Sequence, residues 1–459
     1  MRRLRGDMQH SDSRKPQHRD HLPGEALVGE SDLQYLQTLA RNTIGECRTR
    51  VTIGGRVYPA YMASGSRQYP AFWTRDAVWI SVSGLLTSAD VESMVGILAR
   101  TQNGPEPREL KYGLSVPAWA VADHVLCEDG GAVFFPGTYS AGDDQGDGRF
   151  GTRAAQDACY MFIELAYLWH RQTGETSLFE QKIAGVRLLD RLQYAFESPD
   201  HDEASGLAVT RLESRSVAFS DAIVKTGFLL DGSILRWRAA LRLTCIMSAL
   251  GQSEWSAFYS EVAARIAGSL PGALWHDTRP DEGWLLSASE IGCQDCVRGT
   301  SFALALGILD ADHSNRASRA LAAASASATL DATPRPGQVT YQGHIRHLRR
   351  GEYWEGTPMA PGTYQNGGYW GMFTGWSVRG VAITNRALAC ELAGVFVEHM
   401  RRYSAFDGSD EAHRGAPWEW VHPDGTRIGP LYGPTITLAY RGFSDGFRVD
   451  SMPRLTPPC

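Results

Sequence analysis

Carboxylate side chains stand next to aromatic residues in four short stretches that lie far apart in the chain. The stretches are Tyr69–Trp79, which contains Arg75 and Asp76; Arg149–Asp157; Phe219–Gly227, which contains Asp221; and Trp418–Gly425, which contains Glu419. Hydrolysis of a glycosidic bond requires two carboxyl groups, one protonated and one ionised. Flat aromatic faces cover the C–H face of a sugar ring. Together the stretches predict a carbohydrate site, although each acid taken alone also fits a helix cap or a helix-start charge.

A fifth stretch, Gly362–Trp376, combines side-chain amides with glycines and aromatic rings. Gln365 and Asn366 precede the pair Gly367-Gly368, which favours a turn and a close approach of the backbone. Side-chain amides hydrogen-bond hydroxyl groups, and Trp370 offers a flat apolar face. This composition predicts a contribution to the same carbohydrate site. The alternative is a glycine-rich connection between two buried helices.

Composition and charge are those of a large soluble globular protein. The chain has 459 residues, of which 43% are hydrophobic and 21% are charged. Its formal charge of −6 argues against a surface that binds nucleic acid, because such surfaces need clustered basic residues. No apolar run approaches the roughly 18 residues of a membrane span. We therefore expect neither a nucleic acid nor a membrane as a partner.

The N-terminal residues and the cysteines predict a cytoplasmic location. Residues 1–25 contain arginines but no apolar segment of the kind found in secretory signals, and their polar make-up predicts a disordered tail. The eight cysteines are scattered, which fits free thiols in a reducing compartment. Cys293 and Cys296 form the one close pair. Because no second pair or histidine stands at ligand spacing, we expect no metal site.

From Ser31 onward, apolar residues recur at helical spacing, and polar caps and glycines separate the segments. Ser31 and Ser88 are predicted to open helices. Between residues 153 and 196 one helix is predicted to stop at Gly174, and Ser177-Leu-Phe-Glu180 has the pattern of a capping box that opens the next. The predicted inner stripe of that second helix is Phe179, Ile183, Val186 and Leu189.

This helical hairpin recurs about every seventy residues, for a total of about twelve helices. Later helices are predicted at 222–250, from Ser253 onward, and at 297–310, 314–329, 370–384, 385–402 and after 430. Strand-like alternation is confined to short pieces such as Arg50–Tyr61 and Ala132–Tyr139. The long connections between hairpins are polar, aromatic and glycine-rich, as functional loops are. The pattern predicts one ring of helices with its loops gathered at one end.

In their order along the chain, the motifs resemble those of the six-hairpin glycosidases, which include glucoamylases, trehalases and neutral/alkaline invertases. Phe72-Trp-Thr-Arg-Asp76 is similar to the Trp-Thr-Arg-Asp element with which glucoamylases grip the sugar at the non-reducing end. Arg153-Ala-Ala-Gln-Asp157 resembles their Arg-Pro-Gln-x-Asp element. Tyr364-Gln-Asn-Gly-Gly-Tyr-Trp370 is similar to their Tyr-x-Asn-Gly-x-x-Trp turn and to the Tyr-His-Asn-Gly-Gly of invertases. The resemblance implies an all-α fold, an (α/α)6 toroid of six helical hairpins over residues 26–448, with tails at 1–25 and 449–459.

The resemblance also implies roles for two carboxylates. Asp221 occupies the place of the general acid that invertases and trehalases carry just before a long helix. Glucoamylases have a Glu there after a Trp, whereas Ser220 precedes Asp221 here, so Asp157 remains the alternative acid. Glu419 occupies the place of the general base, with Glu352 and Glu355 as alternatives. The predicted substrate-binding residues are Trp73, Arg75, Asp76, Asp157, Gln365, Asn366, Trp370 and Trp418.

The predicted function is that of an inverting, exo-acting glycoside hydrolase with a small saccharide or glycoside as its substrate and no cofactor. Two other classes remain open: an epimerase or phosphorylase on the same toroid, and a carbohydrate-binding protein without catalysis. An epimerase would need paired histidines near the centre of the ring of helices, but His344 and His347 fall in a basic segment, His344–Arg350. That segment is predicted to be a solvated face rather than a contact for an anionic substrate.

Overall fold

The computed structural model describes residues 26–325, 330, 338–348, 353–354, 357–407 and 414–444. The predicted tails at 1–25 and 449–459 lie outside the described residues, as do Glu352 and Glu355. The helices are α1 Glu30–Cys47, α2 Thr74–Ser81, α3 Ser88–Thr101, α4 Asp157–Thr173, α5 Ser177–Glu180, α6 Leu188–Glu197, α7 Leu230–Ala249, α8 Ser253–Leu274, α9 Val297–Leu306, α10 Ala311–Ala324, α11 Thr374–Ala382, α12 Arg386–Tyr403 and α13 Gly433–Phe443.

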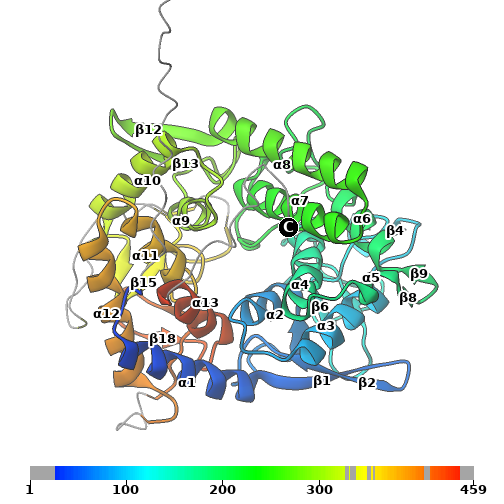
Figure 1. The fold of residues 1–459 in the computed structure, drawn as a ribbon, viewed down its shortest axis with the longest axis horizontal. Coiled ribbons are helices and arrows are strands. Elements are labelled where there is room, and N and C mark those ends of the chain that lie inside the picture. The colour runs from blue at the N-terminus through cyan, green and yellow to red at the C-terminus, as the bar shows by residue number, and fades with distance from the viewer. Residues whose placement is uncertain are drawn as a thin grey trace, which may run out of the picture.

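The helices form two concentric rings (Figure 1). The inner ring is α2, α4, α7, α9, α11 and α13, each in contact with the next, and α13 returns to contact α2. Helices α1, α3, α6, α8, α10 and α12 pack around the outside of this ring. The N- and C-terminal helices lie together, and the backbone N–H of Leu27 donates to the carbonyl of Phe443 at 3.0 Å. The predicted (α/α)6 toroid is therefore confirmed.

Local sequence signals account for several helix ends. Thr87 and Asp90 form a capping box at the start of α3, one residue before the predicted cap Ser88. Helix α4 ends as predicted at Gly174, whose φ of 72° is the left-handed conformation that glycine adopts at little cost. Helix α8 begins at Ser253, as predicted.

Two predicted helices differ from the structure. The helix expected from Ser177 to residue 196 is interrupted after α5, because Ala184 and Gly185 adopt positive φ in the turn between β8 and β9. The helix expected from residue 222 begins only at Leu230, the first residue of α7. The residues before it form a loop and β11 instead. Asp221 therefore lies in this loop, ahead of the helix, and not in its first turn.

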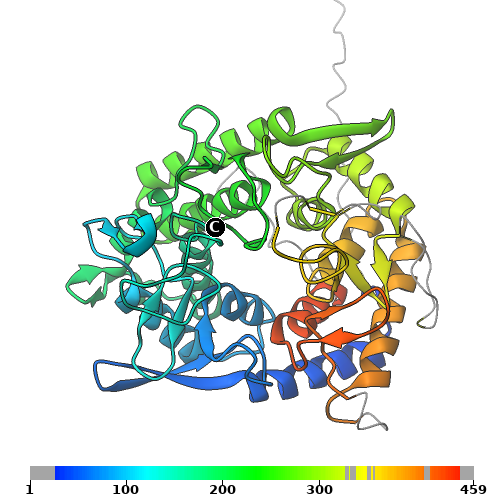
Figure 2. The same ribbon diagram turned by 180° about the vertical axis from the view of Figure 1, so that it is seen from behind.

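The strands are short, as the sparse alternation predicted. They are β1 Arg48–Ile53, β2 Arg56–Tyr61, β3 Ala71–Trp73, β4 Arg108–Glu109, β5 Ser115–Val116, β6 His124–Leu126, β7 Ala132–Val133, β8 Lys182–Ile183, β9 Val186–Arg187, β10 Val209–Thr210, β11 Gly227–Phe228, β12 Trp275–Arg279, β13 Glu282–Leu285, β14 Thr340–Tyr341, β15 His344–Arg346, β16 Tyr369–Trp370, β17 Trp420–Val421 and β18 Arg427–Ile428. Figure 2 shows these strands among the long connections.

Two of the small sheets join stretches that are far apart in the chain. In the sheet β14-β15-β16-β17-β18, β16 pairs with β17 so that Trp370 lies opposite Trp420. This pairing brings the amide-rich turn next to Glu419. In the sheet β3-β6-β7, Trp73 lies opposite His124. The predicted solvated face at His344–Arg350 is wrong for its described part, because His344, Arg346 and His347 are buried.

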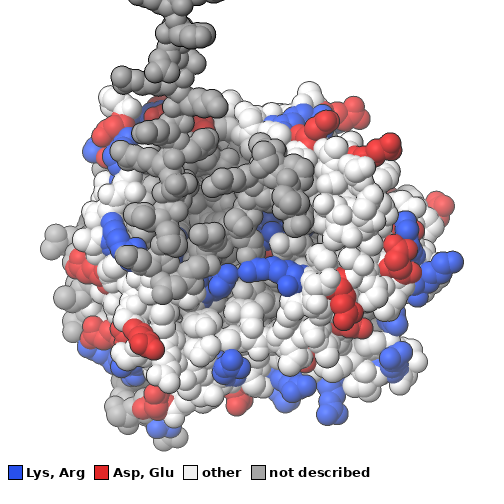
Figure 3. Space-filling model, in the orientation of Figure 1, with Lys and Arg blue, Asp and Glu red and all other residues white. Residues whose placement is uncertain are grey.

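One hydrophobic core cluster runs from Leu27 to Phe443 and includes residues of both rings. Acidic and basic side chains are both present around the face shown in Figure 3. Among the described residues, no helix combines the length and the apolar character needed to cross a membrane.

Candidate active site

A cavity of about 270 Å³ lies where the loops of the predicted motifs meet. It is lined by Ala63, Tyr69, Trp73, Arg75, Asp76, Pro136, Gly137, Tyr139, Phe150, Phe219, Asp221, Met359, Tyr364, Gln365, Trp370, Glu419 and Tyr432. Of the ten residues predicted for the site, these include seven: Trp73, Arg75, Asp76, Asp221, Gln365, Trp370 and Glu419. Asp157, Asn366 and Trp418 are not among them.

Asp221 is held by the amide of Gln365. The Nε2 of Gln365 donates to Asp221 Oδ1 at 2.9 Å, while its Oε1 accepts from the backbone N–H of Ala222 at 3.1 Å. Asp221 Oδ2 lies 3.7 Å from Nη1 of Arg75. Burial raises the pKa of Asp221 to about 6, although the Arg75 guanidinium opposes the rise. Gln365, predicted to bind sugar, thus uses its amide to orient a carboxyl group.

Glu419 enters the cavity just before β17. The hydroxyl of Tyr69 lies 2.8 Å from both Oε1 and Oε2, and the backbone N–H of Glu419 donates to the carbonyl of Gly429 at 2.8 Å. Gly429 has a φ of +68°, and a Cβ there would lie 2.5 Å from the Cβ of Glu419, so the close approach requires glycine. Burial raises the pKa of Glu419 to about 8; the Tyr69 bond lowers it, and the charges of Asp76 and Asp221 raise it.

Arg75 sits among three aspartates. Its Nε bonds Asp157 Oδ2 at 2.7 Å, and its Nη2 lies 3.5 Å from Asp123 Oδ1, in addition to the contact with Asp221. Burial favours the neutral guanidine, but the three carboxylates outweigh it and hold the pKa of Arg75 well above its ordinary value. Asp157, predicted to bind sugar and named as the alternative acid, therefore lies behind Arg75 and orients it.

Asp76 and the aromatic side chains complete the cavity. The hydroxyl of Tyr432 donates to Asp76, and burial raises the pKa of Asp76 to about 6. Trp370 donates from its indole Nε1 to the carbonyl of Tyr364 at 3.0 Å, which fixes the plane of its ring. Such rigid aromatic faces next to hydroxyl and carboxyl groups suit a ligand with one apolar and one polar side.

Asn366 and Trp418 contact protein instead of the cavity. The side-chain oxygen of Asn366 accepts from the backbone N–H of Trp354 at 2.6 Å, and its Nδ2 donates to the carbonyl of Met359 at 2.8 Å. The ring of Trp418 packs on Gly415, where a Cβ would lie 2.0 Å from the indole. Both side chains therefore support the loops, and their predicted contact with a sugar stays a prediction.

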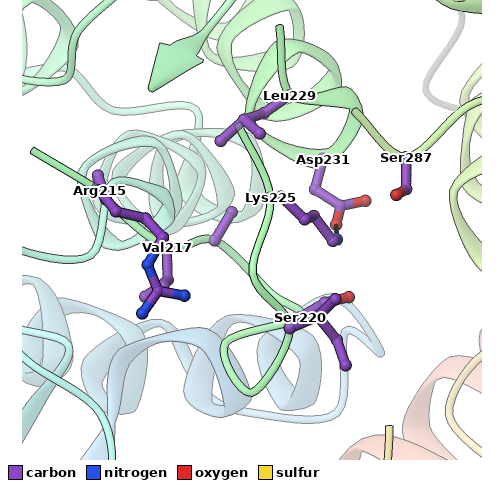
Figure 4. Close-up of a pocket in the computed structure, with 10 residues that line it drawn as sticks. Arg215, Val217, Ser220, Lys225, Leu229, Asp231 and Ser287 are labelled. Carbon is purple, nitrogen blue, oxygen red and sulfur yellow. Dashed lines mark hydrogen bonds and ion pairs between the residues drawn. The ribbon is translucent and has the colours of Figure 1, made fainter. Parts of the chain in front are cut away.

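A buried charge cluster lies near Ser220, the residue before Asp221, and Figure 4 shows the side chains of its members Lys225 and Asp231 pointing toward one another. Lys225 Nζ lies 3.3 Å from Asp231 Oδ2, and the Arg298 guanidinium pairs with the same oxygen. Arg298 also donates from Nη2 to the Oγ of Ser220 at 3.1 Å. Arg298 therefore ties the residue before Asp221 to the start of helices α7 and α9.

Several residues of the site escaped the sequence prediction. Tyr69 and Tyr364 stand inside the motif stretches, but nothing in the sequence shows that the Tyr69 hydroxyl bonds Glu419 or that Tyr364 lines the cavity. Asp123 precedes β6 and reaches Arg75 only because β6 pairs with β3. Tyr432 comes from the start of α13, where ring closure brings it to Asp76.

The described residues contain no group of three or more His, Cys, Asp or Glu side chains placed to hold a metal ion. The close pair of cysteines separates, since Cys293 is exposed and Cys296 is buried. The Sγ of Cys296 instead accepts from the backbone N–H of Gly299 at the start of α9.

Two solved structures resemble this fold. A GH78 family rhamnosidase of Bacillus sp. GL1 matches 92% of this chain with a TM-score of 0.53 and 12% sequence identity. A bacterial glucoamylase complexed with acarbose matches 91% of this chain with a TM-score of 0.53 and 11% identity. This chain spans 36% of the rhamnosidase chain and 58% of the glucoamylase chain.

No family model and no curated protein sequence matches the chain. Both structural neighbours are glycoside hydrolases. The chain shares the (α/α)6 toroid with them.

Proposed function

We propose that the protein is an inverting, exo-acting glycoside hydrolase that uses Asp221 and Glu419 as its catalytic carboxyl groups. The observation that carries the proposal is that these two acids, from distant parts of the chain, line one cavity together with Arg75 and Asp76. In an inverting reaction, water attacks the anomeric carbon as the bond to the leaving oxygen breaks. The leaving oxygen takes a proton from one carboxyl group, and the water gives a proton to the other.

The hydrogen bonds support Asp221 as the acid and Glu419 as the base. The Tyr69 hydroxyl is equidistant from both oxygens of Glu419, which suits an ionised carboxylate with two equivalent acceptors. Gln365 engages one oxygen of Asp221, and the other, 3.7 Å from Arg75, is left to carry a proton. Arg75, Asp76 and Tyr432 then supply donors and acceptors for sugar hydroxyl groups.

The pKa values of the two acids have the opposite order, about 6 for Asp221 and about 8 for Glu419. Between these values the pair holds one proton, and the more populated state has it on Glu419. The proposed roles need the less populated state, with the proton on Asp221. We assign the roles from the hydrogen bonds, because a leaving oxygen bound beside Asp221 favours the protonated form of that group.

The cavity suits one uncharged sugar ring. Its volume of about 270 Å³ is close to the lower end of the roughly 300–1,000 Å³ of small-molecule sites. Arg75 is the one basic side chain among the described residues that line it, and three aspartates already surround that guanidinium. A carboxylate or phosphate on the ligand would therefore meet no free cation. This arrangement also argues against a phosphorylase, which must bind phosphate, and no histidine lines the described cavity for an epimerase.

The test is a screen of hydrolysis against uncharged aryl glycosides and glycosyl fluorides, followed by two variants on the best substrate. Asp221→Asn should slow poor leaving groups by several orders of magnitude and an activated one, such as nitrophenol, far less. Glu419→Gln should slow all leaving groups alike, and azide should restore turnover by replacing the activated water. Glu197→Gln, a change of an exposed acid on α6, is the control for folding.

The anomeric proton of the first-formed product, followed by NMR, should have the configuration opposite to that of the substrate. A retained anomer would refute the inverting mechanism. If azide instead restores turnover in Asp221→Asn, and the rate of Glu419→Gln depends on the leaving group, then Glu419 is the acid and Asp221 is the base. If no glycoside or fluoride is hydrolysed, the proposal of a hydrolase is wrong.

A further inference from the structure

The residues that line the cavity differ in exposure and charge between its buried floor and its more exposed mouth. Its carboxyl groups are deeply buried, with Glu419 2% exposed and Asp221 8% exposed. Tyr139, in contrast, is 44% exposed, and Phe150 and Met359 are partly exposed. These three line the same cavity and carry no charge. The carboxyl groups thus lie in the buried part of the cavity, and these three uncharged side chains lie in its more exposed part.

The side chains at the mouth are held in place by packing. Tyr139 lies edge-on to Trp73, with ring centroids 6.2 Å apart and planes at 84°, and its centroid is 5.4 Å from that of His124. Phe150 rests on Gly137, where a Cβ would lie 2.3 Å from the Phe150 ring and where φ is +82°. Glycine at 137 is therefore what allows the Phe150 ring to lie over the loop. Met359 comes from a different loop, just before the amide-rich turn.

We propose that Tyr139, Phe150 and Met359 form a leaving-group subsite that selects apolar, aromatic aglycones over a second sugar. The inference rests on the proposed hydrolase function and specifies its substrate class. An aromatic aglycone gains from burial of its apolar surface and from edge or face contacts with the two rings. A sugar in the same place would need partners for its hydroxyl groups, and apart from the single phenol of Tyr139 these three side chains offer none.

His124 packs against Tyr139 and helps to hold it in place. Its Nδ1 lies 2.9 Å from Asp123 Oδ2, its Nε2 lies 2.8 Å from the carbonyl of Thr138, and its ring stacks on Trp73 at 4.1 Å. The bond to Thr138 anchors the loop that carries Tyr139. The subsite is thereby joined to the same Asp123 that contacts Arg75.

The test compares three substrates with one common sugar: a glycosyl fluoride, which has no aglycone, a phenyl glycoside and a disaccharide. In Tyr139→Ser, Phe150→Ala and Met359→Ser, the ratio of kcat/KM for the phenyl glycoside to kcat/KM for the fluoride should fall about tenfold. The ratio for the disaccharide to the fluoride should change less than threefold. Tyr194→Ser is the matched control, since Tyr194 on α6 is also 44% exposed but lies outside the cavity.

Binding of free phenol, measured by saturation-transfer NMR, tests the subsite without turnover. The wild type and Tyr194→Ser should bind phenol, and the three variants at the mouth should bind it more weakly. The inference would be overturned if the variants lost kcat/KM equally for the phenyl glycoside and the disaccharide, or equally for all three substrates. Unchanged binding of phenol in the variants would overturn it as well. A wild type that binds phenol but hydrolyses none of the three substrates would refute the hydrolase and leave the aromatic subsite supported.

Discussion

Burial and neighbouring acids raise the pKa of Glu419 further than they raise the pKa of Asp76 or Asp221, the other carboxyl groups that line the cavity. Glu419 is buried, it faces Asp76 and Asp221, and its stabilising donor is the Tyr69 hydroxyl. Because the charges of neighbouring acids add to the effect of burial, only part of this set can be ionised at once near neutral pH. The protonation of the site is therefore a property of the group of acids together.

The rate should show a bell-shaped dependence on pH. The active state has one proton on the Asp221–Glu419 pair. Below about pH 6 the second carboxyl group also takes up a proton, and above about pH 8 the last proton is lost, so activity falls on both sides. Measurement of kcat/KM from pH 4 to 10 checks this, and a rate that stays constant through pH 9 and above would contradict it.

Removal of the Tyr69 hydroxyl should move the alkaline side of that curve. Tyr69→Phe loses the donor that favours ionised Glu419, so the pKa of Glu419 should rise further and the alkaline fall should occur at higher pH. A lost bond to a charged group corresponds to a decrease in kcat/KM of roughly 10–100-fold. Tyr194→Phe is the control, and an unshifted profile in Tyr69→Phe would show that the bond does not act on the base.

At the scale of elements, helices α4 and α7 are joined by a buried ion cluster. Glu164 accepts from Arg238 at 2.7 and 2.8 Å and from Arg242 at 2.9 and 3.3 Å. Burial alone would raise the pKa of Glu164, but the two guanidinium groups lower it far below its ordinary value. Its contribution to stability is therefore present above the unfolded-state pKa and is lost as the pH falls below that value.

Glu164→Gln should destabilise the fold by roughly 3–5 kcal/mol near neutral pH, because two buried cations lose their counter-charge. Urea unfolding at pH 7 measures the loss. Glu398→Gln, at an exposed pair with Arg402 on α12 separated by 3.0 Å, should cost at most about 1 kcal/mol. Equal losses in the two variants would mean that the cluster contributes little to the packing of α4 on α7.

Helices α11 and α13 approach each other through glycines. A Cβ on Gly375 would lie 2.4 Å from the carbonyl oxygen of Leu438, whereas a Cβ on Gly394, in the outer helix α12, would meet nothing within 4 Å. Gly375→Ala should therefore lose roughly 1–3 kcal/mol through overpacking. Gly394→Ala should gain up to about 1 kcal/mol, because alanine favours a helix. Thermal unfolding of both variants checks the difference in sign.

At the scale of the whole molecule, the ring closes through contacts between its two ends. Leu27 bonds Phe443, and Gln37 on α1 donates to the hydroxyl of Tyr440 on α13 at 2.9 Å. A single core cluster links both rings. We expect one cooperative transition, with the same midpoint by far-UV circular dichroism and by tryptophan fluorescence. Separate midpoints would show that parts of the ring unfold independently.

The sequence by itself determined the helices, their pairing into hairpins and the order of the motifs. Helical periodicity and capping act within a few residues, so α3, α8 and the end of α4 could be predicted from local signals. The break in the helix expected after Ser177 was missed because Ile183 and Val186 continue the apolar period across the turn at Ala184 and Gly185. The positive φ of Ala184 and Gly185 ends the helix there, although the apolar spacing continues.

Only the tertiary structure decided which side chains meet in the cavity. Asp157 lies behind Arg75, and Asn366 bonds the backbone near Trp354, although both stand in motifs that predict sugar contacts. Tyr69 contacts Glu419, which lies 350 residues later in the chain. Such contacts depend on the closure of the ring and on the register of small sheets such as β16 with β17. They could not be predicted from local sequence, because a shift of one residue in that register would turn Trp370 to the other face.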